Sequence, residues 1–285
     1  MKYNKVLKFI SKEILFFLTL LIVIVMSLLK DNFLTIENVI GILLVVSVEG
    51  MILYGMTFTM ILGDIDLSVG AIMSLTCVIT IFLQRYGTVA AIVGGIVTGL
   101  VIGITNGYFI GYKKAASMPI TLGMMVFLNG LVLTLTNAKS ISGETEIFPK
   151  IANTPIFGIP SVIYILIIIA FIFHMILSRT QFGRNLYAIG GNIHAAEQAG
   201  INVKKSKMLT FVISGFLAGL SGVLLVSRYN VGSVLTGQQT ATFIITIALM
   251  GGVSLKGGEG TITNAFKGMI FVAILGNTMM FLGFQ

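Results

Sequence analysis

Long apolar runs separated by short polar breaks constrain the fold of this chain more than any other feature of its sequence. A helix needs about 20 apolar residues to cross the roughly 30 Å hydrocarbon core of a bilayer. Reading the runs between polar breaks gives nine candidate spans: Ile14–Leu29, Asn38–Leu62, Leu67–Leu83, Thr88–Ile110, Met118–Thr136, Val162–Leu177, Met208–Val226, Thr240–Gly252 and Thr261–Leu282. The eighth run is short and ends in Gly251-Gly252, which predicts a half-helix. The sequence therefore predicts an all-α polytopic membrane protein with about nine transmembrane segments in a single domain, residues 1–285.

The composition excludes most soluble classes of protein. Hydrophobic residues make up 56% of the chain and charged residues only 10%, whereas soluble domains carry about 25% charged residues. The single cysteine, Cys77, excludes a disulfide framework, and the two histidines, His174 and His194, stand far apart in the sequence. No Gly-Lys dipeptide is present, hence no Walker A loop, and no hydrolase triad or dinucleotide-binding motif. We therefore expect no metal, no cofactor and no catalytic site in this chain.

Basic residues are unevenly distributed between the two sets of loops, and this asymmetry predicts the orientation. With the N-terminus inside, twelve basic residues lie on the inner side and five on the outer side. The inner ones are Lys2, Lys5, Lys8, Lys12, Lys113, Lys114, Arg179, Arg184, Lys204, Lys205, Lys207 and Lys256, and the outer ones are Lys30, Arg85, Lys139, Lys150 and Arg228. We expect a cytoplasmic N-terminus, a large outer loop at 137–160 and a large inner loop at 178–207. A bilayer, and not a nucleic acid, accounts for the net charge of +8.

Glycines recur at every fourth position along the fourth apolar run. They are Gly95, Gly99, Gly103, Gly107 and Gly111. Such a stripe lets a helix press its backbone against a neighbour where larger side chains could not fit. We interpret these residues as helix-packing positions that carry no information about a solute.

Polar residues interrupt the apolar pattern at residues 63–70, Gly-Asp-Ile-Asp-Leu-Ser-Val-Gly. Charge exposed to lipid is costly, so this segment is either a tight solvated turn with a helix cap or a helix break beside a pathway. Asp66 and Ser68 are the candidate residues for both interpretations. Glu49 falls near the middle of the second run, and acidic residues within membrane spans are functional candidates by default. We therefore name Glu49, Asp66 and Ser68 as candidate pathway residues, with a structural hydrogen-bonded acid as the alternative for Glu49.

A short helix is predicted on the inner loop. Asn192 is a good N-cap, the alanines that follow favour helix, and Gly200 suits the position after the last turn. A helix of about two turns is marginal in water, so it must pack against this bundle or against a partner. The candidate contact residues are Gly190, Gly191, Asn192, Ala195, Ala196 and Gly200.

Three of these segments carry a resemblance to a known family. They are Ile65-Asp66-Leu67-Ser68-Val69-Gly70, the stretch Tyr187–Asn192 with Ala195-Ala196 and Gly200-Ile201-Asn202-Val203, and Gly251-Gly252-Val253-Ser254-Leu255-Lys256-Gly257-Gly258-Glu259-Gly260. Together they resemble motifs of the permease subunits of ribose-type bacterial ATP-binding-cassette sugar importers. The match runs in register from about Asp31 to the end of the chain.

The resemblance implies a passive pathway for a ribose-like monosaccharide across the bacterial cytoplasmic membrane. It implies a homo- or heterodimer of permeases, a separate cytoplasmic ATPase and an extracytoplasmic sugar-binding protein. It also identifies the inner-loop helix as the coupling helix seated on the ATPase. The family has ten spans, so this chain is expected to lack the last one. It departs from the family at Asp64, usually glycine, at Glu49, commonly a neutral polar residue, and at Glu197, frequently basic.

Other functions remain open at this point. The cargo of the same kind of importer could be a nucleoside or a furanose-like signalling molecule. A proton-coupled secondary transporter using Glu49 and Asp66 is a different class, and a non-functional remnant is a third. The capped inner-loop helix favours the ATP-driven importer, because a secondary carrier needs no docking element.

Overall fold

The structure is a computed structural model that describes residues 13–284. Lys2, Lys5, Lys8 and Lys12, which entered the charge count above, lie outside the described residues, as does Gln285. Within that range seven helices are long and apolar enough to cross a membrane. They are α3 (Ile36–Leu62), α4 (Val69–Leu83) with its continuation η1 (Gln84–Tyr86), α5 (Thr88–Gly107) with its π-helical continuation η2 (Tyr108–Tyr112), α6 (Ser117–Thr136), α8 (Ser161–Arg179), α11 (Val203–Tyr229) and α13 (Ile262–Phe281).

The remaining elements are shorter. Two are apolar helices, α2 (Ile14–Leu29) and α12 (Thr240–Met250), and four are short helices, α7 (Phe148–Asn153), α9 (Gln181–Gly191), α10 (Ile193–Gln198) and η3 (Val234–Gly237). Strand β1 (Ile141–Ser142) pairs with β4 (Val231–Gly232), and β2 (Pro155–Ile156) pairs with β3 (Ile159–Pro160). Each of the nine apolar runs coincides with a helix, and the helical membrane architecture is confirmed. Seven of these helices reach spanning length in the described residues, with α2 and α12 falling short.

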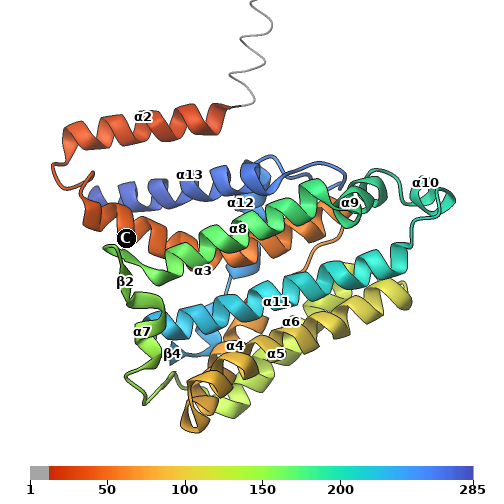
Figure 1. The fold of residues 1–285 in the computed structure, drawn as a ribbon, viewed down its shortest axis with the longest axis horizontal. Coiled ribbons are helices and arrows are strands. Elements are labelled where there is room, and N and C mark those ends of the chain that lie inside the picture. Colours follow the sequence, from red (N-terminus) through yellow and green to blue (C-terminus); the bar gives the residue numbers. More distant parts are fainter. Residues whose placement is uncertain (1–12, 285) are drawn as a thin grey trace, which may run out of the picture.

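The helices form two layers (Figure 1). Helices α3, α8 and α13 lie side by side in one layer with α2 outside α13, and α4, α5, α6 and α11 form the other. Helix α11 packs against α3, α4 and α5, so it joins the layers, and the core lies around it. Helices α9 and α10 lie at one end of the molecule, and α7 with the short strands lies at the opposite end. These two ends are called the α9–α10 end and the α7 end.

The glycine stripe of α5 faces α11. A Cβ on Gly99 would lie 2.3 Å from the carbonyl oxygen of Gly215, and one on Gly103 would lie 2.6 Å from that of Phe211. Further along, Gly107 and Gly111 approach the backbone of α11 equally closely, and Gly95 meets side chains of α4 and α11. The two helices therefore pack backbone to backbone, as the spacing of the glycines predicts.

Two irregular segments break the helical pattern inside the bundle. Gly63, with φ +87°, ends α3, and α4 begins only at Val69. After α11 the chain turns back through β4 and η3, where the backbone N–H of Gly237 donates to Ser74 Oγ at 2.9 Å. Gly237 and Gly70 touch, since a Cβ on Gly70 would lie 2.2 Å from the Gly237 carbonyl oxygen. Irregular backbone at membrane depth is tolerated where it is buried in protein or lines a cavity.

Helix α12 is a half-helix. Its eleven residues extend about 16 Å, roughly half of the hydrocarbon core. The segment before it, Val231–Gln239, contains β4 and η3 and no α-helix. The expected breaks near 63–70 and 239–258 are therefore both present, and the beginnings of α4 and α12 meet inside the bundle.

Candidate functional site

Three glycine-containing segments that are far apart in the sequence meet at the α9–α10 end. The backbone N–H of Gly258 donates to the carbonyl oxygen of Ile61, the penultimate residue of α3, at 2.8 Å. A Cβ on Gly190 of α9 would lie 1.9 Å from that same oxygen. A Cβ on Gly257 would lie 2.9 Å from both the Gly190 carbonyl oxygen and the Gly63 Cα. We call Gly63, Gly190, Gly257 and Gly258 the glycine junction; it ties α3, α9 and the loop before α13 into one contact.

A tyrosine adds a second link between α9 and this loop. The Tyr187 hydroxyl donates to the carbonyl oxygen of Gly260 at 2.7 Å. Burial raises the pKa of the Tyr187 phenol above its usual value, so the group stays a neutral donor. The 251–260 loop is therefore held to α9 by both backbone packing and a side-chain hydrogen bond.

The unusual Asp64 has a partner. Lys207 Nζ, near the start of α11, lies 2.7 Å from Asp64 Oδ2, and the two side chains are only 19% and 10% exposed. The ion pair therefore attaches the 63–68 turn to α11 beside the glycine junction. Sequence reasoning listed both residues and did not connect them, because they are 143 positions apart.

Asp66 lies at the centre of a buried hydrogen-bond cluster. Its Oδ1 accepts from the Ser68 backbone N–H at 3.0 Å and from Ser68 Oγ at 2.6 Å, and its Oδ2 accepts from Ser214 Oγ at 2.8 Å. Asn106 Nδ2 donates to Ser68 Oγ at 2.9 Å, so α5 joins the cluster. Both Asp66 and Ser68 are fully buried. The arrangement braces the 63–68 turn against α5 and α11; Asn106 and Ser214 were missed by sequence reasoning, although each is a polar residue on a glycine-bearing helix face.

The short helix α10 has the expected caps. Asn192 Oδ1 accepts from the Ala195 N–H at 3.0 Å, and Gly200 adopts φ +80° after the last turn. Ala196, expected at the exposed contact surface, is instead only 3% exposed, because this face of α10 packs onto its own chain. The large apolar residue that α10 leaves at the surface is Ile193, which is 37% exposed and was not singled out from the sequence.

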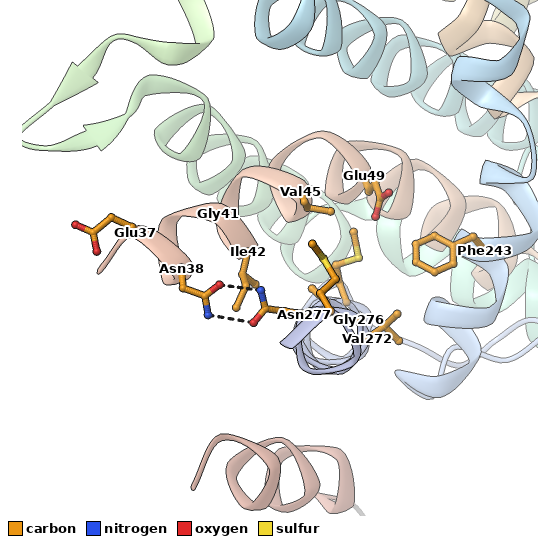
Figure 2. Close-up of a pocket in the computed structure, with 13 residues that line it drawn as sticks. Glu37, Asn38, Gly41, Ile42, Val45, Glu49, Phe243, Val272, Gly276 and Asn277 are labelled. Atoms are coloured by element: carbon orange, nitrogen blue, oxygen red, sulfur yellow. Dashed lines mark hydrogen bonds between the residues drawn. The ribbon is translucent and has the colours of Figure 1, made fainter. Parts of the chain in front are cut away.

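Glu49 lies in a different place, at a cavity of about 490 Å³ between α3, α12 and α13 (Figure 2). The side chain is half-buried and shares the cavity wall with Phe243 of α12. Apolar residues dominate the wall, and its polar members are Glu37, Asn38, Glu49 and Asn277. Asp66 and Ser68 do not line this cavity. The three predicted pathway residues therefore divide into Glu49 at a cavity and a buried pair that braces a turn.

The 137–160 segment covers the α7 end. Helix α7 packs on α11, where Ser227 Oγ accepts from the Ala152 N–H at 2.9 Å and donates to the Phe148 carbonyl oxygen at 2.9 Å. The pairing of β1 with β4 joins the loop to the segment that leads to α12. No group of three or more His, Cys, Asp or Glu side chains that could hold a metal occurs among residues 13–284.

Comparison with known proteins assigns these features to a family. Residues 38–285 match the family described as branched-chain amino acid transport system / permease component. The L-arabinose transport system permease protein of Escherichia coli (strain K12) is 35% identical over 256 residues, which cover 89% of this chain and 78% of that protein. The ribose import permease protein of Bacillus subtilis (strain 168) is 36% identical over 267 residues, 92% of this chain and 83% of that protein. The chain belongs to this family of transport permeases. The D-allose transport system permease protein of E. coli is 33% identical over 273 residues, which cover 95% of this chain and 84% of that protein. No solved structure gives a significant match.

The resemblance read from the sequence is thereby confirmed. The three motifs on which it rested are also the segments that the structure of this permease brings together, since 65–70, 187–192 and 251–260 all contribute to or adjoin the glycine junction. The permease is a multi-pass membrane protein. Of its candidate pathway residues, Asp66 and Ser68 are hydrogen-bonded inside the bundle and Glu49 lies at the cavity.

Proposed function

We propose that this permease is the membrane-spanning subunit of an ATP-binding-cassette importer that moves a ribose-like monosaccharide across the cytoplasmic membrane. Relatives named for ribose, arabinose and allose transport support the substrate class. The observation that carries the proposal is the glycine junction, because it connects α9, next to the short exposed helix α10, to α3 and to the loop before α13. The sequence contains no Walker A loop, and in this proposal ATP is hydrolysed by a partner subunit.

In this proposal the N-terminus lies in the cytoplasm and the α9–α10 end faces the ATPase. Lys204, Lys205 and Lys207 open α11 at that end, in line with the positive-inside rule. Helices α2 and α12 bring the number of crossings to nine. Glu49 lies on the solute pathway, whereas Asp66 and Ser68 hold the 63–68 turn that supports it.

The partners are assigned to opposite ends. Helix α10 docks on the cytoplasmic ATPase, and the 137–160 loop at the α7 end receives the extracytoplasmic sugar-binding protein. A second permease copy, identical or homologous, closes the Glu49 cavity from its open side. Movement of the ATPase then reaches α3 and α13 as a rigid-body shift through the glycine junction.

Reconstitution tests this function. The permease is placed in liposomes with its ATPase and binding protein, and uptake of labelled ribose, arabinose and allose is measured with and without ATP. Concentrative uptake of at least one sugar that requires ATP is expected. Accumulation driven by a proton gradient without the ATPase would show a secondary transporter instead, and uptake of a nucleoside alone would change the substrate class.

A further inference from the structure

Two asparagines join α3 to α13 at the α7 end of the Glu49 cavity. Asn38 Nδ2 donates to Asn277 Oδ1 at 3.0 Å, and Asn277 Nδ2 donates to Asn38 Oδ1 at 2.8 Å (Figure 2). Asn38 Nδ2 also donates to the Phe33 carbonyl oxygen at 2.7 Å, which fixes the orientation of both amides. We call this reciprocal pair the amide clasp.

The clasp lies at one end of the cavity and Glu49 lies further along it. Both asparagines and Glu49 contribute to the cavity wall. Asn38 is in the first turn of α3, eleven positions before Glu49, which corresponds to about 16 Å along the helix. Asn277 is in the last turns of α13. A solute entering from the α7 end therefore meets the clasp before it meets Glu49.

The clasp is also the polar part of the contact between the ends of these two helices. Beside it the Phe33 and Phe281 rings pack edge to face with centroids 5.5 Å apart, and Phe33 is buried. The apolar contact holds the helix ends together, whereas the two amide–amide hydrogen bonds can be exchanged for bonds to another polar molecule. Each amide offers one acceptor and two donors.

We propose that the amide clasp closes the α7 end of the Glu49 cavity and is opened by a polyhydroxylated solute. This proposal rests on the proposed function. Adjacent sugar hydroxyls each donate and accept, so one sugar can satisfy the carbonyl and the amino group of both asparagines when they part. An apolar or purely cationic solute cannot do so, and breaking the clasp would leave unpaired amides in an apolar wall. Asn38 and Asn277 are therefore specificity-determining residues for neutral polyols.

A cysteine reporter tests the clasp in the assembled transporter. Cys77 is fully buried, so a cysteine introduced at Val45, a cavity-wall residue that is 42% exposed, reports alone. The rate of its labelling by a membrane-impermeant maleimide, added from the binding-protein side, is compared in Val45→Cys and in Val45→Cys combined with Asn277→Leu. Loss of two hydrogen bonds should raise the rate roughly tenfold. Asn264→Leu, on the same helix but with no side-chain hydrogen bond to α3, should leave it unchanged.

Solute dependence completes the test. Millimolar ribose, arabinose or allose should accelerate labelling of Val45→Cys severalfold. Tetramethylammonium, a cation with no hydroxyl, should not, and Asn277→Leu should abolish the sugar effect. Asn277→Asp keeps the size of the side chain but cannot donate to Asn38, so its basal labelling rate should be intermediate. This variant replaces Asn277→Leu if the leucine variant folds poorly. Equal basal rates in all variants, or a sugar effect that survives Asn277→Leu, would overturn the proposal. Labelling needs neither ATP nor net uptake, so failure of transport with normal labelling would instead count against the proposed function.

Discussion

Gly190 lies so close to Ile61 that a methyl group on Gly190 would come within 1.9 Å of the Ile61 carbonyl oxygen. That oxygen also accepts the hydrogen bond from the Gly258 N–H. A side chain on Gly190 would therefore separate α9 from the end of α3 and break the link to the loop before α13. No flexible side chain is present that could move aside, because both facing groups are backbone.

Gly190→Ala should therefore lower ATP-dependent sugar uptake by at least tenfold while the permease still reaches the membrane. The control is Gly123→Ala in α6, away from the junction, because a Cβ there meets no atom within 4 Å. Uptake in reconstituted liposomes, together with coupling between sugar and ATP hydrolysis, measures the effect. Equal uptake by the two variants would remove the glycine junction from the transmission of movement.

The Asp64–Lys207 ion pair predicts a strong asymmetry between single and double variants. Lys207→Met leaves the nearly buried Asp64 carboxylate without its partner and should destabilise the protein by about 2 kcal/mol. Asp64→Asn combined with Lys207→Met removes both charges and should recover most of the loss. Thermal unfolding in detergent of the wild type, both single variants and the double variant gives the coupling energy. Additive losses in this cycle would mean that the pair contributes nothing beyond its separate members.

Backbone packing between α5 and α11 predicts a large cost for one methyl group. Gly99→Ala would place its Cβ 2.3 Å from the Gly215 carbonyl oxygen, so the helices must separate, at a cost of about 3 kcal/mol. Gly130→Ala, in α6, meets no atom within 4 Å and should be neutral or slightly stabilising. The yield and melting temperature of the purified variants distinguish the two. A neutral Gly99→Ala would show that the stripe tolerates a wider spacing.

The hydrogen bond from Tyr187 to Gly260 predicts a defined pH dependence. Tyr187→Phe should cost about 1 kcal/mol of stability. Because burial raises the phenol pKa in the folded state, the contribution is complete below the unfolded-state pKa of about 10 and is lost as pH rises through the folded-state pKa. The difference between Tyr187→Phe and wild type should thus be constant from about pH 6 to 9 and shrink above pH 10. A difference that varies already below pH 9 would assign the effect to another group.

Local sequence patterns predict the helices well, but they predict only some of the residues of the candidate site. Each apolar run coincides with a described helix, and the cap residues Asn192 and Gly200 delimit α10, because these signals depend on neighbours in sequence. The glycine junction and the Asp64–Lys207 pair depend on contacts between residues that are far apart in the chain, and local sequence patterns do not reveal them. The amide clasp could likewise not be predicted from the sequence, because its two asparagines lie in two separate apolar runs.

The buried face of the short helix α10 also could not be predicted from the sequence. The sequence of α10 has no apolar stripe long enough to orient it, so Ala195, Ala196 and Ala199 look equivalent. The structure distinguishes them, because Ala196 faces the bundle and Ala195 and Ala199 face solvent. The orientation follows from the docking of α10 on α9 and the start of α11, and this docking is a tertiary contact.

The orientation of α10 separates two effects of an added charge, one on docking and one on stability. Ile193 is an exposed large apolar residue on α10, so in the proposed complex it is the apolar residue that contacts the ATPase. Ile193→Arg should therefore abolish co-purification of the ATPase subunit and sugar-stimulated ATP hydrolysis, while the melting temperature of the isolated permease stays within about 2 °C of wild type. Ala196→Arg should instead lower the melting temperature of the isolated permease, because it buries an arginine without a partner. Loss of ATPase binding would follow from that destabilisation. Gln198→Arg, at an exposed position on the same helix, controls for added charge alone. An Ile193→Arg permease that still binds and activates its ATPase would mean that coupling passes through a part of the inner loop other than α10.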